Sequence, residues 1–516
     1  MKVPRNRSVA QTRARKDATL ERLSVFIQPS PSGSSASWKR MQDEYMLDIF
    51  QGSAKHVPAY RQFLKEKGFL AKTVNTMTDF RHIPPVSKQN YLKKFPWEDL
   101  CVPGALSGKS LVLTATSGST GKPFYFPRTD SIDEQSYIMH RTFLKNSGLD
   151  PAEPTLVIVA FGMGVWIGGL ITYEAFNRIS ERDFPLTILT TGVNKKEIYD
   201  ALREIGPRYT QLVLCGYPPF IKDVIDDGPE NGVQWKQFDM RIVCAAEGFS
   251  EDFRDYLLRK TGMRDAYRDV MNIYGSAELG TMATETPLAI LVRKLTLAHP
   301  LLFTRLFTEA TRLPTLAQFV PTFVSFEAAD NRIYCTAGNA LPLIRYEIGD
   351  HGGVFTYSEL VKACGEEGID LKNEIRTAGI SDTVAELPFV YIYERADLST
   401  KLYGAIIFPE HVKHGLMRRE LERYVTTKFT MFTKTDAKQD EYLEVNVELK
   451  ENVKPTPELQ HTVAEAIVES LMEKSAEHKN NVGALGDRVR PRVVFWAHNH
   501  HEHFAHGGKH KWVKKS

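Results

Sequence analysis

Short apolar runs alternate with segments of helix length through the middle of the chain. The apolar runs at 155–161, 185–191, 209–216 and 240–248 have the length of strands and end at glycine or polar residues. Segments such as 195–205 separate them. A continuous apolar run is typical of a strand buried on both faces, so the alternation predicts βαβ units and a parallel sheet. Ligands of such sheets bind at the carboxyl ends of the strands, where these glycine-rich turns fall.

Helices are predicted on both sides of this region. Residues 38–68 have a helical pattern, and Ser87 is placed to cap a short helix after a pair of prolines. Residues 287–307 are strongly apolar but contain three basic residues and a proline, so the segment is too interrupted to span a bilayer. We expect two packed helices there, and a surface that contacts a membrane or an apolar substrate is the alternative.

Length and composition limit the possible classes of protein. A chain of 516 residues is too long for one ordinary core, so two or three domains are expected. A net charge of +3, from 66 basic and 63 acidic residues, requires neither nucleic acid nor an acidic surface as a partner. The five cysteines have no CxxC spacing, which argues against a disulfide framework and a thiolate zinc site. We therefore expect a cytoplasmic protein.

Both ends of the chain are polar. Residues 1–37 are basic and serine-rich without an apolar core, so we expect a flexible tail instead of a secretory signal, with an organelle transit peptide as the alternative. Six of the fifteen histidines lie in 498–510. They lack the Cys/His spacing of zinc sites, so we expect a polar loop there.

A loop rich in glycine and hydroxyl groups, TATSGSTGKPFYF at 114–126, lies between two apolar stretches. Glycine lets backbone N–H groups approach an anion closely, and Lys122 adds a cation. The Walker A pattern is excluded because Pro123 follows the lysine where that motif needs Ser or Thr. The composition also fits an ordinary hairpin turn. The loop is therefore a candidate phosphate site that needs support from the rest of the chain.

Two carboxylates follow strand-like segments. Glu278, in NIYGSAELG, is a hard oxygen ligand suited to Mg²⁺, although a glutamate at a helix start also compensates the helix dipole. Asp350, in LPLIRYEIGDHG, can accept hydrogen bonds from ribose hydroxyls, although an Asp turn before Gly352 fits equally. Activation of a carboxylate by ATP brings two anions together, so a site for it must neutralise phosphate charge.

These three segments occur in order with ERADLSTKLYGAIIFPEHV at 394–412 and GGKHKWVKK at 507–515. The set resembles the adenylate-forming enzymes, specifically the phenylacetate-CoA ligase branch, from about residue 40 to the C-terminus. The resemblance implies an α/β fold with a large multi-sheet N-terminal domain (38–394), a small α+β C-terminal domain (395–516) and an active site at their interface. It implies a reaction of a carboxylic acid with MgATP to give an acyl-adenylate and pyrophosphate, followed by acyl transfer to coenzyme A.

The resemblance also implies roles for individual residues. The phosphates of ATP would be held by Ser117, Gly118, Ser119, Thr120, Gly121 and Lys122. The remainder of the nucleotide and its metal would be held by Glu247, Tyr274, Gly275, Ser276, Asp350 and Arg395, with Glu278 as metal ligand and catalytic residue. The acid pocket would be lined by Phe161, Gly162, Trp166 and Tyr217. The catalytic lysine would be Lys509, with Lys511 as the competing candidate, and Asp397 would be the hinge.

The predicted partners are small molecules. An aromatic pocket wall favours an aryl or otherwise apolar acid. The acceptor is expected to be coenzyme A, with an amine or a carrier-protein thiol as the alternative. Ala277 stands where the family usually has Ser or Thr, which motivates an alternative of another class, a non-catalytic nucleotide-binding or membrane-associated scaffold. Neither nucleic acid nor membrane contact is expected, and the oligomeric state, a dimer included, is not predicted.

Overall fold

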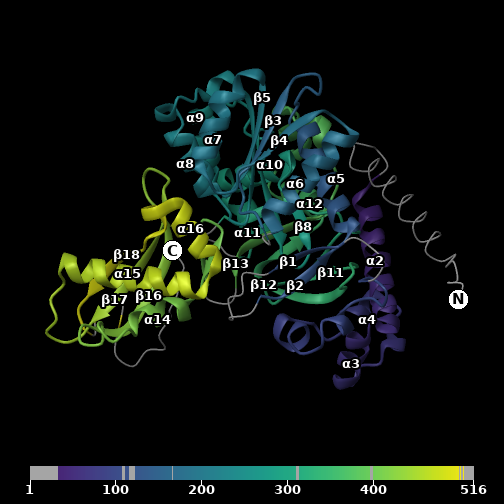
Figure 1. Cartoon of the computed structure of the whole chain (residues 1–516). Coiled ribbons are helices and arrows are strands. Elements are labelled where there is room, and N and C mark those ends of the chain that lie inside the picture. The colour runs from purple at the N-terminus through teal and green to yellow at the C-terminus, as the bar shows by residue number, and fades with distance from the viewer. Residues whose placement is uncertain are drawn as a thin grey trace, which may run out of the picture.

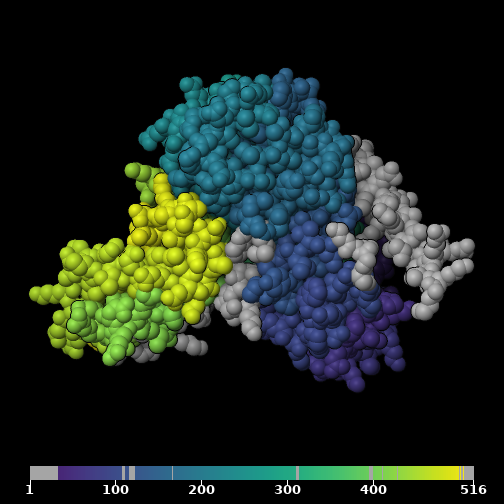
Figure 2. All heavy atoms as spheres, viewed as in Figure 1, coloured from purple at the N-terminus to yellow at the C-terminus, as the bar shows by residue number. Residues whose placement is uncertain are grey.

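The structure is a computed structural model that describes residues 33–106, 111–115, 123–164, 167–308, 313–395, 399–498, 500 and 504. Most of the chain forms one large body, and the C-terminal part forms a smaller one beside it (Figure 1). Figure 2 shows this smaller part, in green and yellow, against the teal segments of the large body. The expected fold class, a large α/β part with a small C-terminal α+β part, is confirmed.

Two helices, α2 (Ser35–His56) and α3 (Pro58–Glu66), occupy the region where one continuous helical pattern is predicted. Val57 is extended between them, and Pro58 begins the second helix because its missing N–H is not needed there. Ser87 caps the short turn Lys88–Leu92 as predicted, since its Oγ accepts from Asn90 N at 3.2 Å. Further short turns are Ala71–Thr73, α4 (Met77–Phe80) and Glu98–Leu100.

The large body is built on a sheet of eleven strands among the described residues, in the order β10-β11-β12-β13-β9-β8-β7-β6-β5-β3-β4. Its strands are β3 (Thr155–Val159), β4 (Leu186–Thr190), β5 (Gln211–Gly216), β6 (Asp239–Ala245), β7 (Val270–Ser276), β8 (Gly280–Thr284), β9 (Thr315–Gln318), β10 (Ser325–Ala329), β11 (Arg332–Ala337), β12 (Leu343–Phe355) and β13 (Phe389–Arg395). Strands β3 to β7 pair in parallel, as the apolar runs predict, and the others pair antiparallel.

Helices cover both faces of the parallel part. They are α5 (Asp130–Asn146), α6 (Ile167–Arg182), α7 (Lys195–Glu204), α8 (Pro218–Asp227) and α9 (Glu251–Thr261). Leu156 and Ile158 of β3 pack in the same core as α7, α8 and α9, whereas Val157 and Val159 pack in the core that contains α5 and α6. Because successive side chains of a strand point to opposite faces, burial of both faces requires the uninterrupted apolar runs in the sequence.

The apolar segment 287–307 forms the two packed helices expected, α10 (Pro287–Ala298) and α11 (Pro300–Leu306). Arg293, one of its basic residues, is 1% exposed and pairs with Glu285 at 2.6 Å and Glu251 at 3.1 Å. No helix among the described residues is both long and apolar enough to cross a membrane. Helices α12 (Tyr357–Glu366) and α13 (Leu371–Thr377) complete this core.

The C-terminal part has sheets of its own. A hairpin of β14 (Thr400–Leu402) and β15 (Ala405–Ile407) precedes a three-stranded sheet of β16 (Val425–Thr435), β17 (Glu441–Leu449) and β18 (Arg492–Trp496). Its helices are α14 (Pro409–Leu416), α15 (Pro457–Lys474) and α16 (Ala476–Leu485). The last strand of the large sheet ends at Arg395. The division of the chain into domains at 394 and 395 remains a prediction.

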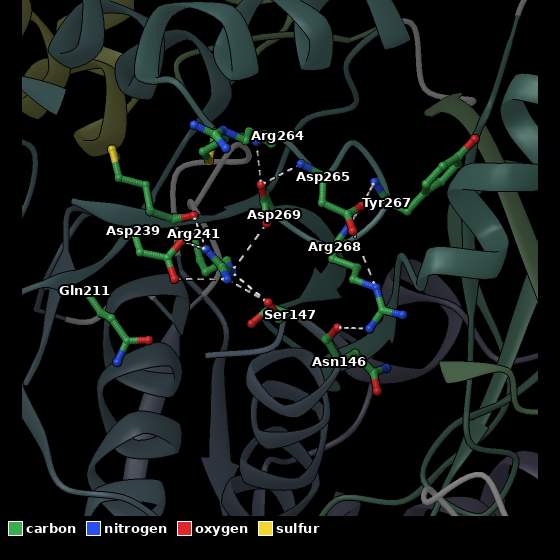
Figure 3. A network of polar contacts seen from close by, with 12 residues as sticks. Asn146, Ser147, Gln211, Asp239, Arg241, Arg264, Asp265, Tyr267, Arg268 and Asp269 are labelled. Atoms are coloured by element: carbon green, nitrogen blue, oxygen red, sulfur yellow. Dashed lines mark hydrogen bonds and ion pairs between the residues drawn. The ribbon is translucent and has the colours of Figure 1, made fainter. Parts of the chain in front are cut away.

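A polar network fixes the amino ends of the central strands (Figure 3). Arg241 of β6 donates to Ser147 O at 2.7 Å and pairs with Asp269 at 3.4 Å, just before β7 begins. Arg268 donates to Asn146 O at 2.8 Å. Both arginines thus bind carbonyl groups at the C-terminal end of α5, which have no partners within the helix. This network lies at the amino ends of the strands, whereas ligands are expected at the carboxyl ends.

All five cysteines are buried and free. Burial raises the pKa of each thiol, for Cys101 and Cys364 to about 11.

Candidate active site

A cavity of about 1350 Å³ lies at the carboxyl ends of the parallel strands, between the large sheet and the C-terminal part. The large body contributes the ends of β5, β6 and β7 and the middle of β12. The C-terminal part contributes the β14–β15 hairpin, the facing ends of β16 and β17, and the first turn of α16. Residues from both parts therefore line the same cavity.

Three predicted nucleotide-binding residues meet at one wall of this cavity. The Tyr274 hydroxyl donates to Asp350 Oδ2 at 2.5 Å, which links β7 to β12. The Tyr346 hydroxyl donates to Glu278 Oε1 at 3.2 Å, in the turn between β7 and β8. Gly275 and Ser276 also line the cavity. The sequence places Asp350 after a strand, but β12 continues through it to Phe355, with Gly349 at a φ of +91° and a register shift after Asp350.

Glu247 lies in the turn after β6 and joins the two parts of the molecule. Its backbone oxygen accepts from Asn272 Nδ2 at 3.0 Å, and its Oε1 accepts from the backbone N–H of Gly404 in the β14–β15 turn. Burial raises the pKa of Glu247, and burial together with the neighbouring charge of Glu247 raises the pKa of Glu441. A raised pKa in both groups favours a carboxyl–carboxylate pair that shares one proton.

The predicted acid-pocket residues form a second wall, which we call the aromatic wall: Phe161, Gly162 and Tyr217. The rings of Phe161 and Tyr217 are 5.2 Å apart at 74°, an edge-to-face contact. The Tyr217 hydroxyl accepts from Gly162 N at 3.4 Å. A Cβ at Gly404 would lie 2.6 Å from the Tyr217 ring, so the hairpin turn approaches this wall as closely as glycine allows.

Several predicted residues lie outside the described part of the chain: Ser117, Gly118, Ser119, Thr120, Gly121, Lys122, Trp166, Asp397, Lys509 and Lys511. The strands on either side of the glycine-rich loop, β1 (Val112–Ala115) and β2 (Tyr125–Arg128), pair antiparallel. This pairing agrees with a hairpin and leaves the phosphate role of the loop a prediction. The backbone of Arg395 lies opposite Asp350 in the β12–β13 register.

The charged cavity residues without a predicted role include Lys88, Lys401, Glu441 and Glu477. Lys401 donates to Ala246 O at 2.7 Å, a second link between the two parts. The cap at Ser87 fixes the turn that carries Lys88. Lys401 lies within residues 394–412, one of the segments that carry the family resemblance, and this is the only feature of the sequence that points to it. No motif marks Glu441 or Glu477, because they lie in an ordinary strand and an ordinary helix.

The donors and acceptors present fit an adenine nucleotide. Asn272 is 2% exposed, and its Oδ1 has no hydrogen-bond partner among the described residues, although Asn272 lines the cavity. A buried acceptor of this kind suits the exocyclic amino group of a base. The described ranges contain no cluster of three or more metal-binding side chains. Glu278 would therefore hold Mg²⁺ as a single protein carboxylate, with phosphate oxygens and water completing the shell.

Comparison with solved structures finds likeness along nearly the whole chain. A structure of 2-hydroxyisobutyryl-CoA ligase with 2-HIB-AMP and CoA, in the thioesterification state, matches with a TM-score of 0.62 at 16% identity, over 94% of this chain and 91% of that one. The same ligase in the postadenylation state with 2-HIB-AMP matches with a TM-score of 0.52, also at 16% identity, over 94% and 90%.

Sequence comparison adds nothing to this likeness, since no protein-family model and no curated protein matches. At this identity the structural match concerns the fold. The chain therefore has the same fold as 2-hydroxyisobutyryl-CoA ligase, from its N-terminal helices to its C-terminal sheet.

Proposed function

We propose that the protein activates a carboxylic acid with ATP, releases pyrophosphate, and transfers the acyl group from the acyl-adenylate to coenzyme A. The observation that carries the proposal is the convergence of Glu247, Tyr274, Glu278 and Asp350 on one cavity from the ends of β6 and β7 and from β12. These residues are distant in sequence, and the sequence resemblance implies that they bind one nucleotide and its metal. The shared fold with a CoA ligase that was solved with an acyl-adenylate and CoA supports the same reaction.

Asp350 would accept hydrogen bonds from the ribose, and Tyr274 would orient it through the 2.5 Å hydrogen bond. Asn272 and Glu247 would face the base. Glu278 would hold Mg²⁺, which would neutralise phosphate charge as the α-phosphorus is attacked. Phosphate contacts from 117–122, a contact from Arg395 and a catalytic role of Lys509 belong to this proposal.

The aromatic wall is the proposed binding surface for the acid. Phe161 is fully buried and Tyr217 is held by Gly162, so both rings are fixed before a substrate arrives. Fixed apolar walls favour an aryl or otherwise apolar acid over a highly polar one. We propose that the enzyme belongs to the phenylacetate-CoA ligase-like subtype, which its sequence segments resemble.

The position of the C-terminal part suits the second half-reaction. The TM-score is 0.62 against the thioesterification state and 0.52 against the postadenylation state of the same ligase, at equal identity. We propose that residues 395–516 turn about Asp397 between the two half-reactions. The contacts of Gly404 and Lys401 with the turn after β6 would then belong to the acyl-transfer arrangement.

Pyrophosphate exchange tests the proposal. The purified protein, MgATP, labelled pyrophosphate and a panel of aryl, branched and short-chain acids should give label in ATP with at least one acid. Acceptance of CoA would then appear as consumption of its thiol, whereas an amine or a carrier-protein thiol as acceptor would leave free CoA unchanged. No exchange with any acid would favour the nucleotide-binding scaffold suggested by Ala277.

A further inference from the structure

Glu477 is a buried carboxyl group of the cavity that the reaction described so far does not use. It occupies the first turn of α16 and lines the cavity on the side of the C-terminal part. The backbone N–H of Ile406 in β15 approaches the carboxyl group as a donor. Oε2 is buried and has no hydrogen-bond partner among the described residues. This oxygen is therefore available to accept a proton.

The surroundings of Glu477 place it beside the aromatic wall. Burial raises the pKa of the Tyr217 phenol, and the nearby charge of Glu477 raises it further. Lys401 faces Glu477 from β14 and favours its ionised form. Glu247 and Glu441 also line the cavity and interact with each other, and Glu247 Oε1 accepts from Gly404 N. His478, next in α16, is buried, and burial lowers its pKa to about 4, so it is neutral near pH 7.

Acyl transfer to a thiol needs a group of this kind. A free thiol has a pKa of about 8.5, so only a few per cent is ionised at neutral pH. A general base works best when its pKa lies near the working pH. Burial raises the pKa of Glu477 from 4.5 to about 7, against the opposing effect of Lys401. Lys401 itself is engaged with Ala246 O.

We propose that Glu477 is the general base of the acyl-transfer step, a role that rests on the proposed function. The thiol sulfur of CoA attacks the carbonyl carbon of the acyl-adenylate, and its proton passes to Oε2 of Glu477. The new carbon–sulfur bond forms as the bond between the carbonyl carbon and the phosphate oxygen breaks. AMP leaves with that electron pair. Because Glu477 belongs to the C-terminal part, it reaches the aromatic wall when that part is docked as in this structure.

The variant Glu477→Gln separates proton transfer from structure. Its amide oxygen can still accept from Ile406 N, but it cannot take up a proton at neutral pH. Glu458→Gln is a matched control, because Glu458 is also the second residue after a helix N-cap, in α15, and is exposed. Both substitutions remove a negative charge from a helix N-terminus, so a difference between them cannot come from the helix dipole.

Two half-reactions are measured with the acid that the exchange screen selects. Pyrophosphate exchange reports adenylation, and CoA thioester formation from supplied acyl-adenylate reports transfer between pH 5.5 and 9. We expect Glu477→Gln to slow transfer at pH 7 by about 10² and to remove the rise in rate near pH 7, while exchange stays within twofold. Glu458→Gln should match the wild type in both assays.

A second variant gives an independent readout. In Glu477→Ala, added formate should restore part of the transfer rate, since a small carboxylate can occupy the vacated space and accept the proton. Wild-type transfer and an unchanged pH profile in Glu477→Gln would overturn the proposal. Equal losses in exchange and transfer, without rescue by formate, would overturn it too and would make Glu477 an anchor for β15. A screen that selects no acid overturns both the proposed function and this role.

Discussion

The Tyr274 hydroxyl donates to Asp350 Oδ2 at 2.5 Å and so connects β7 with β12, two strands that are four positions apart in the large sheet. Loss of a hydrogen bond to a charged acceptor costs about 1.5 to 3 kcal/mol. We therefore expect Tyr274→Phe to raise the KM for ATP about tenfold or more in pyrophosphate exchange, with little change in the KM for the acid. Tyr274→Phe should raise the KM for ATP far less in a protein that already carries Asp350→Asn than in the wild type, because the two residues act as one unit. Full additivity would contradict this.

Glu278 provides a test of the metal site. Replacement by Gln keeps a hydrogen-bond acceptor for Tyr346 but removes the charge that would hold Mg²⁺. We expect the Mg²⁺ concentration for half-maximal exchange to rise about tenfold or more, with activity recovering at high Mg²⁺. The measurement is a Mg²⁺ titration at fixed ATP. An unchanged titration curve would make Glu278 a structural residue of the β7–β8 turn.

Lys509 is predicted to act in adenylation. Its replacement by Ala should slow acyl-adenylate formation by about 10² or more. The reason is that a cation which stabilises negative charge developing in the transition state of adenylation acts in that step alone. Transfer from supplied acyl-adenylate should stay near the wild-type rate. Lys511→Ala is the control. If Lys511→Ala showed the loss and Lys509→Ala did not, the role would pass to Lys511.

Arg293 and Lys294 are neighbours in α10 with opposite surroundings. Arg293 is 1% exposed and pairs with Glu285 and Glu251, whereas the side chain of Lys294 is 28% exposed and pairs with Asp255 at 3.5 Å. Removal of one partner of a buried ion pair costs about 3 to 5 kcal/mol, and an exposed pair contributes below about 1 kcal/mol. Denaturant unfolding should therefore show a much lower midpoint for Arg293→Met than for Lys294→Met. Equal midpoints would contradict the buried network.

Glu477 should also make stability depend on pH, whatever its catalytic role. Its pKa is about 7 when folded and near 4.5 when unfolded, so the folded protein binds more protons between these values. Stability conferred by the neutral carboxyl is present below pH 4.5 and is lost as pH rises towards 7, up to about 3 kcal/mol. Glu477→Gln should accordingly unfold at a higher temperature than the wild type at pH 8 and at a similar temperature near pH 4.5. Calorimetry of both proteins between pH 4.5 and 8 measures this difference in unfolding temperature. A variant that unfolds at a lower temperature than the wild type at pH 8 would contradict the prediction.

The sequence predicts the position of a helix or strand correctly where the local pattern of apolar residues determines which side chains are buried. The strands β3 to β6 and the helix α7 are where the apolar runs predict them, because a central parallel strand must be apolar on both faces. The break at Val57 escaped prediction, since a proline is tolerated in the first turn of a helix and does not by itself mark a boundary. The extension of β12 through Asp350 was missed because an aspartate shortly before Gly352 suggests a turn, whereas the strand continues and accommodates the positive φ of Gly349.

The residues of the candidate site also fall into those that the sequence predicts and those that it does not. Tyr274, Glu278 and Asp350 lie in recognisable segments, and their convergence follows from the order of the strands. Glu441 and Glu477 could not be predicted, because their chemistry arises from burial against parts of the chain that are distant in sequence. A carboxyl group acquires a raised pKa from its surroundings in space, and neighbouring sequence carries no trace of it.

The burial of the five cysteines has a practical consequence for enzymology. Thiolates are the reactive form of cysteine, and a pKa of about 11 or above leaves almost none at pH 8. The folded protein should therefore be almost invisible to a disulfide reagent that colours on reaction with free thiols. Such a reagent can count unreacted CoA in a quenched sample against a low background. In a heated sample without CoA, the same colour would report the fraction of molecules that have unfolded.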